Sequence, residues 1–316
     1  MESRFGAYAA LSGGFVLAGS SVVAAKLLAG LPVFFAAAAG TAIALVALIP
    51  LAAAEARSEP GPARRDALRR ALPLLAAQAL FGIALFRILM LLALRLTSAA
   101  VAGVATSATP ALTALLSALF LRERIGPRTA VGITLAALGI ATLQSGGAAL
   151  GAPLGVAGGS GELVGCLLAL GAAASESAFN VLSKRLPAAV GPRLASAAVM
   201  ALALVILGGL SLATGEKVEW ASIGTERLLA LAYMGLFSSA LAYILWFAGV
   251  ARVPASTAGA FAGLMPLSSF ALSIAFLGER PRAAAFAGSA LAIAGILLCA
   301  AAPRRRELSE SADVLT

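Results

Sequence analysis

The sequence predicts an all-α polytopic membrane protein with ten transmembrane helices, arranged as two inverted repeats of five helices each. Three observations indicate this fold class. Hydrophobic residues make up 61% of the 316 positions and charged residues only 12%, which is about half the charged share of a soluble domain. A segment of the chain recurs 156 positions later. The basic residues gather in the short segments between apolar runs, as they do beside a bilayer.

The repeat places residues 98–142 on residues 254–298 without a gap, with fifteen of the 45 aligned positions identical. Matches of Ala or Leu carry little weight in so apolar a chain. The matches that carry weight are Pro110/Pro266, Glu123/Glu279, Arg124/Arg280, Gly132/Gly288 and Gly139/Gly295, all in one register. Such self-similarity indicates an internal duplication.

Each predicted span is an apolar run of the length that crosses a bilayer, about 20 residues. The spans are 6–28, 31–54, 71–94, 98–121, 128–144, 161–183, 188–213, 227–250, 255–277 and 283–301. The first repeat is expected within residues 1–145 and the second within residues 161–303. Residues 146–160 are rich in Gly and Ala and are expected to link the repeats. Residues 55–70 are expected to form a polar loop, and residues 304–316 a cytoplasmic tail.

Lysine and arginine set the predicted orientation. With the N-terminus in the cytoplasm, the inner segments hold 16 basic residues and the outer segments six, while Arg87 lies within a span. Positive charge favours the cytoplasmic side, so both termini are predicted to be cytoplasmic. Because five spans are an odd number, the second repeat enters the membrane upside down, which puts Arg124 and Arg280 on opposite sides. Inverted repeats are typical of alternating-access carriers with a site near the midplane.

The composition argues against several other classes of protein. There is no His, and the two aspartates, Asp66 and Asp313, lie outside the spans. These absences disfavour an enzyme, and no Gly-rich phosphate loop or metal-ligand spacing is present. We therefore expect no cofactor and no metal. The net charge of +9 is dispersed between apolar runs, so we expect no nucleic-acid partner. The long first apolar run has no cleavage region after it, which disfavours a removable signal peptide.

Each copy of the repeat reads as two helices joined by a charged corner, Leu-Arg-Glu-Arg in the first copy and Leu-Gly-Glu-Arg in the second. With the paired prolines and glycines, this pattern resembles the EamA-type domain of the drug/metabolite transporter superfamily. The resemblance implies a secondary transporter of the bacterial inner membrane. Relatives carry amino acids, sugars, nucleotide sugars, cations or drugs. We expect export of a small metabolite such as an amino acid, or of a drug-like compound, and the sequence leaves a homodimer open. The alternative is a non-transporting scaffold or a channel.

Pro110 and Pro266 occupy matched positions inside their spans. Each removes a backbone donor, which frees the carbonyl four residues earlier, at Thr106 and Ala262. In lipid such a carbonyl needs another partner, so these kinks tend to lie against protein or a watery cavity. We interpret both prolines as hinges that line the substrate path. A static bend for packing is the alternative.

The paired small residues have a structural interpretation. Gly132, Gly139, Gly288 and Gly295 place small side chains on one stripe of each helix, which lets two membrane helices pack closely. We expect these two helices to pack away from the substrate path. The paired Glu123 and Glu279 at the helix ends are interpreted as interfacial anchors.

Arg87 and Glu176 are ionisable residues inside predicted spans, where a charge costs at least about 2.5 kcal/mol and marks a candidate functional site. In the functional interpretation, Arg87 attracts an anionic group of the substrate, and Glu176 binds a cationic group or a proton. Burial disfavours a charged carboxylate, so Glu176 is the candidate proton-coupling residue. The alternative is a structural pair between the two, although helix geometry puts them at different depths.

The repeat also places Arg87 on Tyr243 and Met90 on Trp246, so one half offers a charge where the other offers an aromatic ring. We therefore add Tyr243 and Trp246 to the predicted substrate site. Further polar groups in the same helices are Gln78, Asn180, Ser175 and Ser177. Gln78 and Asn180 are predicted to bind substrate. All four could equally form hydrogen bonds between helices.

Overall fold

The computed structural model describes residues 2–28, 30–58, 62–96, 102, 105–144, 160–220, 223–277 and 283–301. Every regular element in these residues is helical. The first half contains α1 (Glu2–Leu27), α2 (Val33–Ser58), α3 (Pro62–Ala79), α4 (Phe86–Leu96), α6 (Thr109–Phe120) and α7 (Pro127–Gln144). The second half contains α8 (Ser160–Lys184), α9 (Pro192–Ala213), α10 (Thr225–Tyr233), α11 (Ala242–Val250), α12 (Ala255–Phe261), α13 (Leu264–Leu277) and α14 (Ala283–Ala300). The predicted tail, nearly all of the predicted linker and the second charged corner lie outside the described residues.

Seven helical stretches in the described part of the chain are long and apolar enough to cross a membrane. They are Val33–Ser58, Arg64–Ala93, Leu163–Lys184, Pro192–Ala213, Thr225–Val250, Ala255–Phe276 and Ala283–Ala300. Two shorter helices, α6 and most of α7, are apolar as well. Large apolar side chains such as Val46, Val205 and Leu297 are mostly exposed, which suits a surface that faces lipid tails. The prediction of an all-α polytopic membrane protein is confirmed.

The polar segment 55–70 is largely helical, and the prediction of a loop there is wrong. α2 continues to Ser58 and α3 begins at Pro62. Proline suits the first turn of a helix, because its fixed φ is helical and its missing N–H is not needed there. The Ala, Leu and Arg residues that follow are strong helix formers. Helical structure therefore extends well beyond the apolar part of both spans.

Two spans contain a π-helical stretch directly ahead of a residue that the sequence singled out. The stretch η1 (Leu80–Leu85) joins α3 to α4 and precedes Arg87. The stretch η5 (Met234–Leu241) joins α10 to α11 and precedes Tyr243. The 156-residue shift places all of η1 within η5. Single π turns inside α-helices are frequent at functional sites.

The spans that carry the paired prolines are broken rather than merely kinked. The first is interrupted by a turn at Ser107 and Ala108, and the second by a turn at Ala262 and Gly263. Proline cannot donate to the carbonyl four residues earlier, so that carbonyl needs another donor. The Ala262 carbonyl accepts the Met265 amide at 3.1 Å. At the first break, the Thr109 hydroxyl donates to the corresponding carbonyl, that of Thr106, at 2.8 Å.

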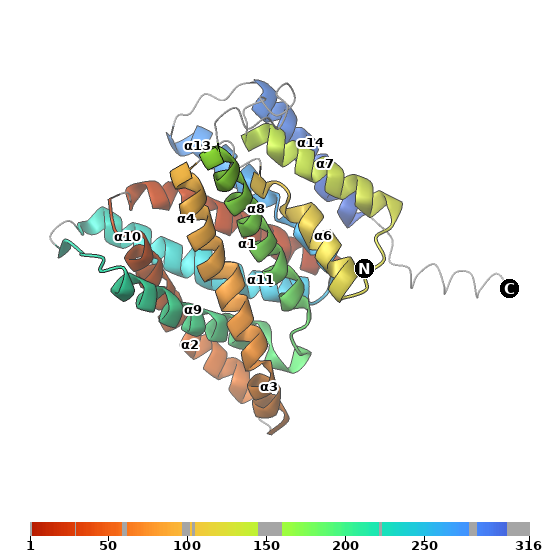
Figure 1. The fold of residues 1–316 in the computed structure, drawn as a ribbon. Coiled ribbons are helices and arrows are strands. Elements are labelled where there is room, and N and C mark those ends of the chain that lie inside the picture. Colours follow the sequence, from red (N-terminus) through yellow and green to blue (C-terminus); the bar gives the residue numbers. More distant parts are fainter. Residues whose placement is uncertain are drawn as a thin grey trace.

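α7 and α14 pack against each other along the glycine stripes and lie side by side in Figure 1. A Cβ atom on Gly139 would come within 2.3 Å of the Ala292 nitrogen and 2.7 Å of the Gly288 oxygen. A Cβ atom on Gly132 would meet the Gly295 oxygen at 2.8 Å. Because residue numbers rise on one helix as they fall on the other, the two helices run antiparallel.

Two carboxylates cap helices that lie in the other half of the chain. Glu55, near the end of α2, accepts a 2.8 Å hydrogen bond from the Leu194 amide in the first turn of α9. Glu216, just beyond α9, accepts hydrogen bonds of 3.0 and 2.7 Å from the amides of Phe34 and Phe35 in the first turn of α2. α2 and α9 therefore lie side by side and antiparallel, each capped by a carboxylate from its neighbour.

Glu123, at the corner between α6 and α7, caps a third helix. It accepts hydrogen bonds from the amides of Ala255 and Ser256, at 2.7 and 3.1 Å, and from the Ser256 hydroxyl at 2.9 Å. These donors form the first turn of α12. Glu123, interpreted above as an interfacial anchor, thus has a specific partner in α12. Its carboxylate satisfies amides that have no partner within their own helix. The matched Glu279 lies outside the described residues.

Replacing Gly139 with Ala should destabilise the protein by about 1–3 kcal/mol, because the added methyl group overlaps the α14 backbone. The matched control is Gly209→Ala in α9, where a Cβ atom would meet nothing within 4 Å. Helix propensity favours Ala over Gly by about 1 kcal/mol, so the control should be neutral or stabilising. Thermal unfolding in detergent measures both variants. Equal effects at the two sites would contradict the close packing of α7 on α14.

Candidate functional site

Two cavities lie between the helices and meet at shared residues. The first, here called the polar cavity, has a volume of about 300 Å³ and is lined by helices of both halves. The second, here called the broken-helix cavity, has a volume of about 380 Å³ and is lined by both helix breaks. Phe86, Glu176 and Met265 line both cavities. These three side chains therefore form the boundary between a more polar and a more apolar space.

Arg87 lines the polar cavity from the first turn of α4, directly after the π stretch η1. In the described part of the chain its guanidinium has no hydrogen bond or ion pair. Tyr243, from the matched position in α11, lines the same cavity and is close enough to interact electrostatically with Arg87. The hydroxyl of Tyr243 is not an anion, so it does not compensate the positive charge of Arg87. A half-buried cation without an anionic partner can bind an anionic group of a ligand.

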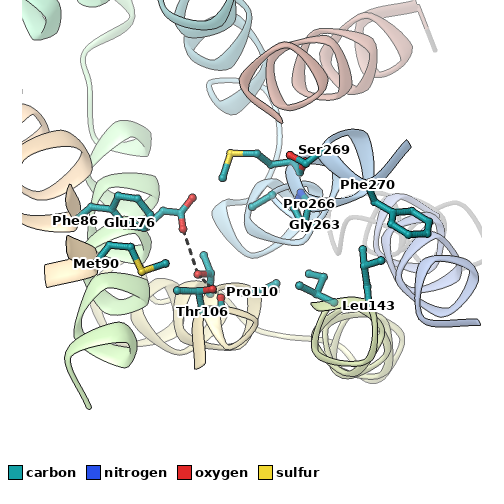
Figure 2. A pocket seen from close by; sticks show the side chains of 14 residues that line it. Phe86, Met90, Thr106, Pro110, Leu143, Glu176, Gly263, Pro266, Ser269 and Phe270 are labelled. Atoms are coloured by element: carbon teal, nitrogen blue, oxygen red, sulfur yellow. Dashed lines mark hydrogen bonds between the residues drawn. The ribbon is translucent and has the colours of Figure 1, made fainter. Parts of the chain in front are cut away.

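Glu176 lies in the middle of α8, at the boundary of the two cavities. Its Oε2 atom accepts a 3.2 Å hydrogen bond from the hydroxyl of Thr109 at the start of α6. Figure 2 shows the carboxylate pointing into the broken-helix cavity, toward α6. Among the described residues no ion pair joins Glu176 to Arg87, although both line the polar cavity. The two charges can therefore bind different groups of one ligand.

Aromatic side chains form one wall of the polar cavity. The ring of Phe179 stacks on Trp246 at 5.8 Å and lies 5.9 Å from Tyr243. Phe15 meets Trp246 edge to face at 5.3 Å. The indole nitrogen of Trp246 donates to the Ser183 hydroxyl at 3.2 Å, which fixes the ring. This wall suits the apolar part of a ligand, because aromatic rings bury a large area in defined orientations.

Two of the predicted polar residues of α8 bond to main-chain groups of helices in the first half. Ser175 donates to the Phe81 carbonyl of η1 at 2.6 Å. The Ser177 hydroxyl lies 3.1 Å from the Thr109 carbonyl and 2.8 Å from the Ala173 carbonyl of its own helix. The first of these bonds satisfies a carbonyl in a π stretch, where the regular helical pattern is interrupted. Both serines therefore hold α8 against the irregular parts of its neighbours.

The two predicted amide residues differ in their surroundings. Asn180 lines the polar cavity and donates to the Thr113 hydroxyl of α6 at 3.3 Å. Gln78 is completely buried in α3, and neither its Oε1 nor its Nε2 has a hydrogen-bond partner in the described chain. Gln78 is not among the residues that line the two cavities. The structure thus brings Asn180 to the site and leaves Gln78 outside it.

The paired prolines both line the broken-helix cavity, one from each half of the chain. Figure 2 shows Pro110 on the α6 side and Pro266 on the α13 side. Ile140 and Leu143 of α7 complete the wall. α7 therefore lines this cavity, whereas both glycine-stripe helices were expected to pack away from the substrate path. One face of α7 packs against α14, and another face, with Ile140 and Leu143, lines the cavity.

Several lining residues were not predicted from the sequence. Phe86, Phe179 and Met265 are apolar residues in apolar spans, so nothing in their identity separates them from lipid-facing positions. Thr109 did carry a signal, because it directly precedes Pro110. A hydroxyl beside a proline in a membrane span is well placed to bond the carbonyl that the proline frees.

The sequence model of the EamA-like transporter family matches the chain twice, over residues 4–144 and 163–301. The uncharacterized transporter YetK of Bacillus subtilis (strain 168) is 29% identical over 301 residues, covering 94% of this chain and 88% of that protein. A probable terminal-alkyne amino-acid exporter of Streptantibioticus cattleyicolor is 28% identical over 244 residues, covering 76% of this chain and 77% of that protein.

One solved crystal structure has the same fold, with a TM-score of 0.73 at 20% identity, covering 94% of this chain and 96% of that one. The predicted resemblance to EamA-type transporters is confirmed, and the names of the relatives indicate a transporter rather than an enzyme. Because the family model covers most of both halves, the chain belongs to the EamA-like transporter family.

Proposed function

We propose that this protein is a secondary-active exporter of a small metabolite that carries an anionic group, such as an amino acid, or of a drug-like compound. The observation that carries the proposal is Arg87, which lines the polar cavity and makes no hydrogen bond or ion pair with the residues that the structure describes. An uncompensated cation inside a membrane protein is costly, and a substrate carboxylate would offset that cost. Arginine also matches a carboxylate with two parallel hydrogen bonds.

The rest of the site supports a substrate with more than one kind of group. The Glu176 carboxylate, at the edge of the same cavity, is available to a cationic group such as an ammonium or to a proton. The aromatic wall around Phe179 and Trp246 is available to an apolar side chain. One relative is named as a probable terminal-alkyne amino-acid exporter. An amino acid contains all three kinds of group.

Alternating access between two inverted repeats is the proposed mechanism. Its support is that matched helices run antiparallel, as α7 does to α14 and α2 does to α9. Repeats related by an axis along the membrane normal would place matched helices parallel, whereas an axis in the membrane plane reverses them. The two helix breaks then lie at equivalent positions across one cavity. Each break offers a hinge at which one half can move against the other.

The proposed setting is the bacterial inner membrane, crossed by ten helices with both termini in the cytoplasm. The charge distribution of the sequence supports this orientation. A scaffold or channel with Arg87 and Glu176 as a structural pair has less support, because the described chain shows no ion pair between them. Counterflow in proteoliposomes with a panel of labelled amino acids, sugars and cationic dyes tests the proposal. A carrier accelerates uptake when unlabelled substrate is inside, and a scaffold or channel does not.

The proposed topology predicts which residues face the cytoplasm. In a variant without Cys166 and Cys299, single cysteines introduced at Arg64 and Arg124 should react only with reagents on the cytoplasmic side. Those at Lys217 and Arg280 should react only with external reagents. The reason is the excess of positive charge in the segments assigned to the inside. Labelling in intact cells and in inverted vesicles measures this. Finding positions 124 and 280 on the same side would contradict the inverted repeats.

Arg87→Ala should weaken the binding of an anionic substrate by roughly 10- to 100-fold, because a charge-assisted hydrogen bond contributes about 1.5–3 kcal/mol. Arg87→Lys should be intermediate, because it keeps the charge and loses the planar fork. The matched control is Arg95→Ala, which removes an exposed arginine two turns further along α4. Concentration-dependent counterflow in proteoliposomes gives the apparent affinities. An unchanged affinity in Arg87→Ala would exclude Arg87 from the substrate site.

Glu176→Gln should abolish uphill transport driven by a proton gradient and leave downhill exchange measurable, because glutamine binds no proton in this pH range yet keeps the shape of the side chain. The measurement compares concentrative uptake with and without an imposed pH gradient. The control is equilibrium exchange in the same vesicles. If the variant still concentrates substrate with the wild-type pH profile, then Glu176 is not the coupling residue.

A further inference from the structure

The first turns of α3 carry arginines on two different faces. Arg64 lies on the face that packs against the chain, where its guanidinium donates to the Ala189 carbonyl at 2.9 Å and to the Glu55 carbonyl. Arg65 and Arg69 are exposed, and neither has a hydrogen bond or ion pair with the residues that the structure describes. Figure 1 shows this end of α3 at the edge of the helix bundle. These two arginines are therefore available to a partner outside the chain.

The same face of the span continues as an exposed apolar stripe. At 3.6 residues per turn, one face holds positions 65, 69, 72, 73, 76 and 80. Leu72 and Leu80 are 46% and 45% exposed, and Pro73 is exposed as well. On the opposite side, Leu75 and Gln78 are completely buried. In a membrane protein an exposed apolar stripe of this kind faces the lipid tails, so the two arginines stand directly above a lipid-facing surface.

The arginines lie at the depth of the lipid headgroups. The helical stretch Arg64–Ala93 has 30 residues, or about 45 Å at 1.5 Å per residue, which is about the thickness of a bilayer with its headgroups. Arg69 lies three residues and Arg65 seven residues before Leu72, or about 5 and 10 Å along the axis. Each headgroup layer is about 5–8 Å thick. Long arginine side chains can reach a phosphate at this depth while their stems cover apolar surface.

The spacing of the charges gives the two exposed faces of this turn different electrostatics. Arg65 and Arg69, four residues apart, are neighbours on the helix surface, and like charges at this spacing destabilise a helix. Asp66 and Arg70, which are also exposed and four residues apart, are opposite charges at a spacing that stabilises a helix. The positive charge that lacks compensation therefore lies on the apolar stripe. An anion between Arg65 and Arg69 would offset their repulsion.

A phospholipid has both features that this face can bind. Its phosphate accepts paired hydrogen bonds from guanidinium groups, whose geometry it matches. Its acyl chains extend from the phosphate toward the bilayer centre, which is the direction in which Leu72 and Leu80 follow the arginines. A headgroup without a positive charge of its own, such as that of phosphatidylglycerol, leaves the full phosphate charge to the arginines. Each basic residue near the membrane surface strengthens the binding of such a lipid by about fivefold.

We propose that the exposed face of α3 is a binding site for one anionic phospholipid. Arg65 and Arg69 hold its phosphate, and one acyl chain lies along Leu72 and Leu80. The site takes a lipid from the leaflet at which α3 begins, and its occupancy does not depend on the substrate in the two cavities. Because Arg64 joins the same turn of α3 to the second half of the chain, a lipid that orders this turn also supports that contact.

Native mass spectrometry of the purified full chain in detergent tests the proposal. The probes are phosphatidylglycerol and phosphatidylcholine with identical acyl chains, each titrated against the protein. The wild type should bind phosphatidylglycerol about 10- to 30-fold more tightly than phosphatidylcholine, because two arginines contribute about fivefold each. The double variant Arg65→Ala, Arg69→Ala should bind the two lipids about equally. Thermal unfolding shows whether each variant is folded before its binding is measured.

The matched control compares Arg70→Ala with Arg69→Ala. The two residues are adjacent, exposed and at nearly the same depth, and they differ in the face on which they lie. Arg69→Ala should weaken phosphatidylglycerol binding about fivefold, and Arg70→Ala less than about twofold, because Arg70 lies off the stripe and near Asp66. A second control is sn-glycerol 3-phosphate, which has a phosphate and no acyl chains. At the same concentrations it should not displace the lipid.

Three outcomes would overturn the proposal. Equal affinity of the wild type for both lipids would mean that this face does not select an anionic headgroup. Equal losses in Arg69→Ala and Arg70→Ala would assign the effect to the net positive charge of this end of α3, and not to a site on one face. Displacement by sn-glycerol 3-phosphate would indicate a site for free anions instead of a lipid. The transport function is tested separately, by the counterflow assay.

Discussion

The structure depends on one constraint, which is that each backbone polar group inside a bilayer needs a partner within the protein. A continuous helix meets this constraint by itself, and the described spans depart from continuous α-helix at the two π stretches and the two proline breaks. The partners at three of them are specific. Ser175 bonds the Phe81 carbonyl, Thr109 bonds the Thr106 carbonyl, and the Met265 amide bonds the Ala262 carbonyl. The irregular backbone lies beside the two cavities, where a transporter needs its hinges and its ligand groups.

The same requirement acts at the helix ends. Glu55, Glu123 and Glu216 each cap the first turn of a helix from the opposite half of the chain. A carboxylate there satisfies free amides and opposes the positive end of the helix dipole. These caps therefore link the helix ends of each half to the other half of the chain.

The two halves share a scaffold and differ in the groups that face the cavities. The glycine stripes, the prolines and the π stretches occur at matched positions. At the cavity, Arg87 is matched by Tyr243, and Thr109 by Met265. Packing positions are held by close backbone contact, as at Gly139, and tolerate little change. Cavity positions are not held by such close backbone contact, so they are free to differ, with a charge in one half and an aromatic ring in the other.

The sequence by itself determined the membrane class, the internal duplication and the family, because hydropathy, the matched prolines and glycines, and the charged corners are all local patterns. It also identified Arg87 and Glu176, since a charge within an apolar run stands out without any structure. Only the tertiary structure decided which apolar residues face the cavities, as with Phe179 and Met265, and that Gln78 lies outside them. It alone showed the π stretches and the bond from Thr109 to Glu176. The physical reason is that in an apolar helix every face has nearly the same composition, so the contacts between helices, and not the residues along one helix, set which side chains meet.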